Sequence, residues 1–216
     1  MENKKEKLEN FKTAISSTVR SLSNSNKIEV SFGNQSTKLN KYSIKLPDLQ
    51  SMSNEINYEE IRAVADSKSL NHRFSNLETL KKYEPEGSIS KKLYNISEKI
   101  RCEKIGTGYF KGVKKNIEKY YQKRISSLDF KNSEDRITES FENFLRIKFL
   151  DFKNQPKIDK KLNSYKKDLN THFDNKIEDL KSFTLDQEKF NSLISKLIQK
   201  MDLDSNLEDE QTRDDE

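Results

Sequence analysis

The spacing of apolar residues constrains the fold of this chain more than any other feature. In residues 5–22, Leu8, Phe11, Ile15 and Val19 recur at intervals of three or four, which places them on one face of a helix. The same helical spacing recurs in residues 88–104, 110–125, 134–151, 158–181 and 184–201. Only five glycines and three prolines interrupt the 216 residues. The sequence therefore predicts a mainly α protein, a multi-helix bundle.

One short region has the period of a β-strand instead. Residues 27–32 and 42–46 alternate polar and apolar side chains, and the intervening residues 33–41 are rich in Gly, Asn and Ser. Pro47 ends the second run. This pattern predicts one small N-terminal β-hairpin at about 27–46, which must pack on a helix because a lone hairpin is only marginally stable in water.

Charge divides the chain into a body and a tail. The formal net charge is +5, yet residues 202–216 hold eight acids and one arginine. We therefore expect a helical domain over residues 1–201 and an acidic, disordered tail or linker start at 202–216. The basic body has two interpretations, an anionic partner or lysines that solvate helix faces, and the interleaving of acids with lysines favours the second.

The chain has the composition of a cytoplasmic protein. Cys102 is the only cysteine, so the chain forms no internal disulfide and a reducing compartment is expected. No apolar run approaches the roughly 18 to 20 residues of a membrane span. Residues 1–9 are charged and lack the apolar core of a secretory signal.

A glycine cluster invites a phosphate-loop interpretation. Gly106, Gly108 and Gly112 lie close together, but Val113 follows Gly112 where a Walker A loop needs a lysine. The spacing of a dinucleotide-binding loop is also absent. The cluster instead predicts a helix break or a close approach of two helices.

Metal or nucleophilic chemistry finds little support. His72, Cys102 and His172 are far apart in the sequence and lack the helical pairing of metal ligands. The chain contains no Gly-x-Ser-x-Gly string, and two histidines leave little room for a catalytic triad. We therefore predict no catalytic, cofactor-binding or metal-binding residue in this chain.

Nucleic-acid binding is the main alternative from composition. Residues 111–124 form a basic run that includes Tyr120 and Tyr121, a combination that can neutralise phosphates and stack on bases. On a helix, however, Val113 and Ile117 fall on one face and the lysines on the other. That arrangement is typical of an ordinary amphipathic helix, so nucleic-acid binding is disfavoured.

The order of several short strings resembles the opening of the CobT subunits of cobaltochelatase. The strings are Phe11-Lys12-Thr13-Ala14 with Arg20, residues 28–32, Leu46-Pro47, Arg62, Ala65-Asp66, Leu70, His72-Arg73 and Pro85-Glu86-Gly87. The most specific stretch is residues 98–116, where Glu98, Arg101, Glu103, Ile105-Gly106, Gly112-Val113 and Asn116 follow the family's spacing. The resemblance covers residues 8–216.

The resemblance implies a role in an ATP-driven metal-inserting complex. Members belong to the aerobic cobaltochelatase, a ligase that inserts Co2+ into hydrogenobyrinic acid a,c-diamide during cobalamin biosynthesis. The complex uses ATP, Mg2+ and Co2+. The partners implied are the CobS subunit, an AAA+ ATPase, and the large CobN subunit, which holds the tetrapyrrole. The chain itself is expected to be a non-catalytic assembly subunit that binds none of these cofactors, and a basic nucleic-acid-binding or general scaffold protein is the alternative.

The sequence departs from the family pattern at its end. It stops at the acidic linker, and the family's C-terminal von Willebrand A-type domain, with its metal-ion adhesion motif, has no counterpart in it. No metal ligand is therefore carried over. A fragment, a split gene product and an active short form are all compatible with this end.

The candidate partner-surface or family-pattern residues follow from the resemblance. They are Arg62, Asp66, Pro85, Glu86, Gly87, Glu98, Arg101, Glu103, Gly106, Gly112 and Asn116. Residues 98–116 are predicted to form a partner surface or a structural hinge, and a purely structural role is equally compatible. Glu98 and Arg101 are three apart on a predicted helix and are expected to pair, a contact worth about 0.2–0.5 kcal/mol if exposed.

Overall fold

The computed structural model describes residues 4–33, 42–49, 58–127, 129–130, 132–154 and 156–204. The prediction of a mainly α fold is confirmed. The chain forms two compact units that are discontinuous in sequence. The N-terminal unit contains Met1–Phe74 and Gly106–Tyr121, and the C-terminal unit contains Ser75–Ile105 and Gln122–Glu216. Of the predicted acidic tail, residues 205–216 lie outside the described part of the chain.

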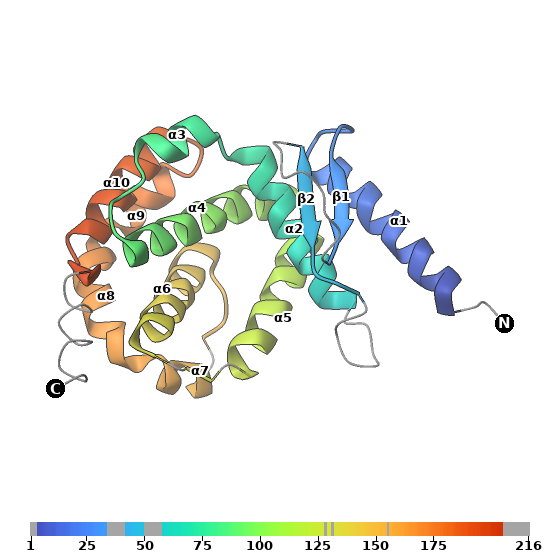
Figure 1. The fold of residues 1–216 in the computed structure, drawn as a ribbon. Coiled ribbons are helices and arrows are strands. Elements are labelled where there is room, and N and C mark those ends of the chain that lie inside the picture. Colours follow the sequence, from blue (N-terminus) through green and yellow to red (C-terminus); the bar gives the residue numbers. More distant parts are fainter. Residues whose placement is uncertain are drawn as a thin grey trace. The chain divides into compact units, whose positions relative to one another are not determined.

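The N-terminal unit packs helices against a two-stranded sheet (Figure 1). Its elements are α1 (Lys4–Leu22), β1 (Glu29–Phe32), β2 (Ser43–Leu46), α2 (Tyr58–Phe74), the last turn of α4 (Ser88–Tyr109) and most of α5 (Lys111–Ser127). α1 contacts α2 and β1, and α2 also contacts β2. The helix predicted at 5–22 and the helix predicted at 110–125 are thereby confirmed.

The two strands lie where they were predicted, but the expected hairpin is wrong in its direction. Glu29 pairs with Ser43 and Phe32 with Leu46, so the strands run parallel. The Glu29 amide donates to the Tyr42 carbonyl at 2.8 Å, and the Gly33 amide donates to that of Leu46 at 3.0 Å. An alternating pattern indicates which side chains share a face and says nothing about strand direction. The long connection allows the parallel pairing, because a four-residue strand spans only about 13 Å and the chain can return to its start.

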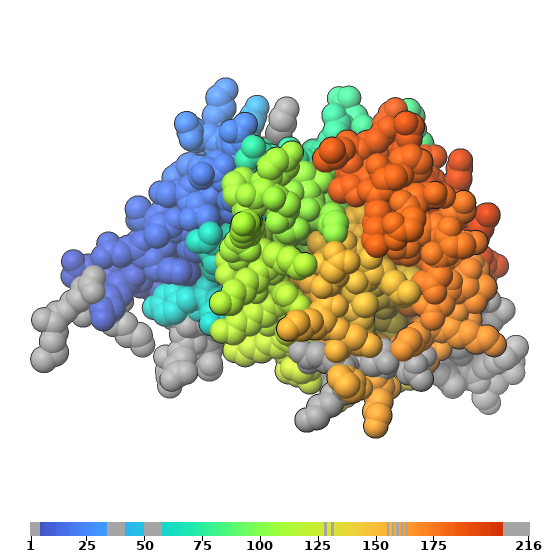
Figure 2. All heavy atoms as spheres, turned by 180° about the vertical axis from the view of Figure 1, so that it is seen from behind, coloured from blue at the N-terminus to red at the C-terminus, as the bar shows by residue number. Residues whose placement is uncertain are grey.

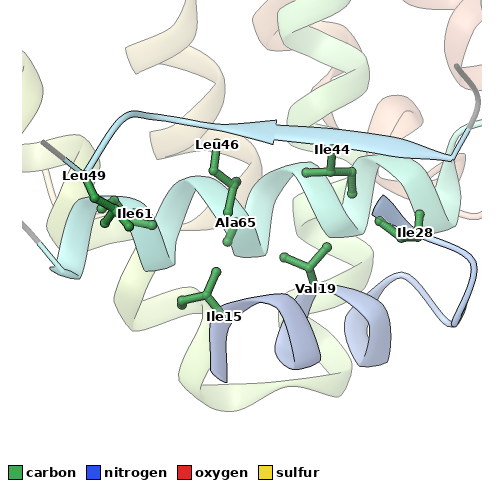
Figure 3. Close-up of a cluster of buried hydrophobic side chains, with 8 residues drawn as sticks. All are labelled: Ile15, Val19, Ile28, Ile44, Leu46, Leu49, Ile61 and Ala65. Atoms are coloured by element: carbon green, nitrogen blue, oxygen red, sulfur yellow. The ribbon is translucent and has the colours of Figure 1, made fainter. Parts of the chain in front are cut away.

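An apolar cluster holds the sheet against α1 and α2 (Figure 3). Its buried members are Ile15, Val19, Ile28, Ile44, Leu46, Leu49, Ile61 and Ala65. Two arginines close the turn that leaves α1: Arg20 Nε donates to the Ile28 carbonyl at 3.1 Å, and Arg73 Nη1 donates to the Leu22 carbonyl at 3.3 Å. Residues from α1, α2 and the two-stranded region thus share one core.

The structure shows how the glycine cluster relates to the two predictions made for it, a helix break and a close approach of two helices. α4 continues through Gly106 and Gly108 and ends at Tyr109, and α5 begins at Lys111, so the predicted helix break falls at Phe110, inside the cluster. A Cβ at Gly106 would lie 2.3 Å from Leu70 Cδ2, which confirms the close approach of α4 to α2 at that position. A Cβ at Gly108 or Gly112 would meet no atom within 4 Å. Only Gly106 therefore has a packing reason.

In its described part, the C-terminal unit contains helices joined by turns and short connections, and no strand. It contains α3 (Leu77–Lys82), α4 up to Ile105, the end of α5, α6 (Ser133–Leu150), α7 (Pro156–Lys161), α8 (Lys166–Phe173), α9 (Ile177–Ser182) and α10 (Gln187–Gln199). α6 matches the helix predicted at 134–151, and Asn132 caps it by accepting from the Asp135 amide at 2.7 Å. Phe141 packs edge-on against Phe173, and Phe149 against Phe190.

The single helix predicted over 158–181 is wrong. This region forms α7, α8 and α9, separated by the 3₁₀ turns Asn163–Tyr165 and Asp174–Lys176. The spacing of apolar residues does not distinguish one continuous helix from short helices joined by 3₁₀ turns, because both repeat at intervals of three to four residues. The apolar residues stay on one side because a short 3₁₀ turn changes the helical register only slightly.

Candidate functional site

A buried carboxylate organises the helices of the N-terminal unit. Asp66 on α2 is fully buried. Arg62 Nε, one turn earlier, donates to its Oδ1 at 2.8 Å, and Asn116 Nδ2 on α5 donates to its Oδ2 at 2.8 Å. Burial raises the pKa of Asp66 above its ordinary value, and the Asn116 and Arg62 hydrogen bonds oppose that shift. The structure thus joins three family-pattern residues. Arg62 and Asp66 are four positions apart on one helix, whereas Asn116 lies 50 positions from Asp66 on another.

A groove of about 450 Å³ lies beside this cluster, between α1, the start of α2 and α5. We call it the α1–α2–α5 groove. In Figure 2 the blue atoms of α1, the cyan atoms of α2 and the green atoms of α5 lie next to one another on the exposed face. Side chains that line it include Phe11, Tyr58, Arg62, Lys115, Asn116 and Lys119. All lie within the N-terminal unit.

The groove combines an aromatic wall with cationic side chains. The rings of Phe11 and Tyr58 meet edge to face with centroids 4.6 Å apart. Lys119 Nζ lies 2.6 Å from Glu59 Oε1, so this lysine is paired. Arg62 uses its Nε for Asp66. The groove therefore presents apolar surface next to positive charge.

The predicted pair of Glu98 and Arg101 is confirmed, but it is not a surface contact. Arg101 Nε and Nη2 donate to Glu98 Oε2 and Oε1, both at 2.8 Å. Arg101 Nη1 also donates to the Thr184 carbonyl at 2.9 Å. Both side chains are buried, with 1% of each residue exposed. Neighbouring residues of the C-terminal unit cover both side chains, and a role of residues 98–116 in binding a partner stays a prediction.

The adjacent thiol shares this environment. Cys102 is buried, and its Sγ lies 3.7 Å from Glu98 Oε1. Burial raises the pKa of the Cys102 thiol well above its ordinary value. A thiol held in its neutral form is a poor nucleophile, so the position is structural.

Glu103 belongs to a second buried network, which joins α4, α5 and α6. Arg146 Nη1 donates to Glu103 Oε2 at 2.7 Å, and Arg146 Nη2 donates to Glu142 Oε1 at 2.7 Å. Lys99 Nζ and Arg124 Nη2 also donate to Glu142, at 2.9 and 3.0 Å. We call these five residues the α4–α5–α6 charge network.

Three cations determine the protonation of Glu142. Burial alone would raise its pKa, but the charges of Lys99, Arg146 and Arg124 outweigh that cost and hold the pKa far below its ordinary value. Of the network, the sequence prediction included only Glu103. The i, i+4 spacing of Glu142 and Arg146 is the local pattern from which part of the network could have been predicted.

Asp204, which lies more than 110 positions later in the chain, explains why the Pro85-Glu86-Gly87 string contains a glycine. Asp204 accepts hydrogen bonds from the Ile89 amide at 3.0 Å and from Ser90 Oγ at 2.6 Å, and so caps the start of α4. Gly87 has φ +90°, and a Cβ there would lie 2.2 Å from the Asp204 carboxylate. Glycine is therefore required at this position both by its backbone conformation and by the space that Asp204 occupies.

The eleven candidate residues fall into two groups. Buried ones are Asp66, Pro85, Glu98, Arg101, Glu103 and Gly106, and those that reach the surface at least in part are Arg62, Glu86, Gly87, Gly112 and Asn116. Only Arg62 and Asn116 of the second group lie together, at the α1–α2–α5 groove. Within the described residues, no three or more His, Cys, Asp or Glu side chains are placed to hold a metal ion. None of the described helices is both long and apolar enough to cross a membrane.

The fold and these pairs define a helical protein whose recognisable polar residues hold its own helices together. Comparison with protein families identifies the particular lineage. Residues 5–216 match the family described as cobalamin biosynthesis protein CobT, so the chain belongs to the CobT family and its role lies in cobalamin biosynthesis. The resemblance noted in the sequence is thereby confirmed over nearly the whole chain. No solved structure matches the chain.

Proposed function

We propose that this chain is a non-catalytic assembly subunit of the aerobic cobaltochelatase. In this role it supports the ATP-driven insertion of Co2+ into hydrogenobyrinic acid a,c-diamide. The observation that carries the proposal is the CobT family match over residues 5–216. CobS and CobN are the proposed partners. ATP, Mg2+ and the Co2+ substrate are bound by the complex rather than by this chain.

The geometry of the family-pattern residues supports a non-catalytic role. Glu98 and Glu103 are buried, and each accepts from an arginine at 2.7–2.8 Å. A general acid or base must reach the proton that it transfers, within about 2.6–3.2 Å of the substrate or through one water. Glu103 instead joins α4 to α6 through Arg146, and Glu98 holds Arg101, which donates to the Thr184 carbonyl.

Nucleic-acid binding receives less support from the same structure. In the basic run on α5, Tyr121 is buried, Lys119 pairs with Glu59, and Arg124 pairs with Glu139 and Glu142. Paired cations contribute little to phosphate neutralisation, and a buried ring cannot stack on a base.

An ATP-dependent capture experiment tests the proposed function. The purified chain is immobilised and offered purified CobS with ATP, with ADP or without nucleotide, and bound protein is quantified. We expect retention of CobS that depends on nucleotide. In a parallel arm, random duplex DNA is titrated at 50 and 200 mM salt. Absence of CobS capture in every nucleotide state, together with DNA binding that weakens steeply with salt, would reverse the assignment.

A further inference from the structure

The α1–α2–α5 groove has more positive than negative charge. Arg62, Lys115 and Lys119 line it, against the single acid Glu59. Glu59 is occupied by Lys119. In the part of the chain that the structure describes, Lys115 forms no ion pair and is exposed. The ammonium group of Lys115 therefore faces the groove without an acidic partner. The N–H groups of Arg62 that do not donate to Asp66 also face it.

A second part of the groove lining is apolar. Phe11, Ala14 and Ile15 on α1, together with Tyr58 on α2, contribute carbon surface to the groove. Because the Phe11 and Tyr58 rings pack edge to face on each other, they form a fixed wall rather than two free stacking platforms. A volume of about 450 Å³ accommodates a few side chains. The chemistry that fits is an apolar side chain flanked by carboxylates.

We propose that the groove is a docking site for the acidic segment, residues 205–216, of a second copy of this chain. The segment contains six acidic residues and one arginine, and Leu207 directly precedes Glu208, Asp209 and Glu210. Leu207 packs on the apolar wall, and the carboxylates that follow meet Lys115 and Arg62. The guanidinium of Arg62 is held in place by Asp66, so it offers its remaining N–H groups in a fixed direction.

This contact rests on the proposed assembly function and deepens it, because it supplies a link between subunits. Charge complementarity is its main support: the segment is the most acidic stretch of the chain, and the groove is cationic. A nucleic acid is a poorer occupant, because the aromatic rings pack against each other and Lys119 is already paired.

A peptide-binding measurement tests the contact. A fluorescent synthetic peptide with the sequence of residues 203–216 is titrated with the full chain, and anisotropy gives Kd. Ala14→Glu and Lys115→Glu change exposed helical positions in the groove and are combined in one variant. Lys123→Glu combined with Lys7→Glu is the matched control, because these exposed lysines lie outside the groove and the net charge changes by at least as much.

We expect the groove variant to bind the peptide at least about tenfold more weakly, and the control to change Kd less than about threefold. Peptides with Leu207→Ala, or with the 208–210 acids replaced by their amides, are each expected to bind more weakly. Sedimentation of the full chain is expected to show concentration-dependent self-association that the groove variant loses. Equal peptide binding by both variants, binding only of a single-stranded oligonucleotide, or peptide binding without self-association would each overturn the proposal. Capture of CobS by a chain that does not bind the peptide refutes this contact alone, whereas peptide binding without capture refutes the proposed function.

Discussion

The two units of this protein bury carboxylates under opposite conditions. In the N-terminal unit, Asp66 faces one arginine and one amide, and burial raises its pKa. In the C-terminal unit, Glu142 faces Lys99, Arg146 and Arg124, and its pKa is lowered although it too is buried. The comparison teaches that the number of cations around a buried carboxylate, rather than burial itself, decides which protonation state the fold favours.

The same difference extends to what holds each unit together. The N-terminal unit relies on the apolar cluster between α1, α2 and the sheet, and on the close approach of Gly106 to Leu70. The C-terminal unit also has an aromatic core, but its charge network ties α4, α5 and α6 together across long sequence distances. Removing one member of such a network leaves another charge buried and unpaired, which is costly.

The largest loss of stability is expected from a substitution that breaks the charge network. Arg146→Met leaves Glu103 without the arginine that neutralises it and removes one of three cations from Glu142. We expect the free energy of unfolding to fall by about 3–5 kcal/mol. Urea denaturation followed by circular dichroism measures the change. As a control, Lys148→Met removes an exposed pair with Asp174 and is expected to cost about 1 kcal/mol or less. Similar losses in the two variants would show that the network is not stabilising.

A second change tests the sign of the Glu142 shift. Because the folded-state pKa lies below the ordinary value of 4.5, the stabilisation by ionised Glu142 is fully present above that value and is lost as the pH falls through the folded pKa. We expect Glu142→Gln to cost about 2–3 kcal/mol at neutral pH. The difference from the wild type should shrink below pH 4.5 in a urea series measured from pH 3 to pH 7. A difference that stays constant with pH would contradict the shift.

A third change tests whether the N-terminal unit depends on close apolar packing instead. At Gly106 an added methyl would overlap the Leu70 side chain, so Gly106→Ala is expected to destabilise by about 1–3 kcal/mol. Gly108→Ala, two residues further along α4, is the matched control, because an added Cβ there would meet no atom within 4 Å. It is expected to be neutral or to stabilise by up to about 1 kcal/mol, because alanine favours the helix. Thermal denaturation compares the two variants, and equal effects would contradict the close approach.

The smallest change in stability is expected at Asp66, and its pH dependence tests the contrast with Glu142 most directly. Because the folded-state pKa of Asp66 is raised above its ordinary value of 3.8, any stability that it contributes is fully present below that value and is lost as the pH rises through the folded pKa. Relative to Asp66→Asn, the wild type should therefore lose stability as the pH rises, which is opposite to the trend for Glu142. The change is expected to be about 1 kcal/mol or less. The same urea series measures it, and parallel pH trends for the two sites would refute the contrast between the units.

Local spacing predicted some of the candidate site and missed the rest. Glu98 and Arg101 were predicted to pair because side chains three positions apart on a helix are neighbours on its surface. The partner of Glu103 was not predicted, because Arg146 lies 43 positions away on another helix. Asp204 likewise caps α4 from 114 or 115 positions away, and no local pattern relates it to Gly87.

The sequence by itself determined the helical character of the chain, the place of both strands and the family resemblance, because each depends on residues close together along the chain. Tertiary structure alone decided that the strands run parallel, that the helix expected over 158–181 is interrupted, and that Glu98, Arg101 and Glu103 are buried rather than exposed. The physical reason is that periodicity shows which residues share a face, whereas the segments that cover that face come from distant parts of the chain.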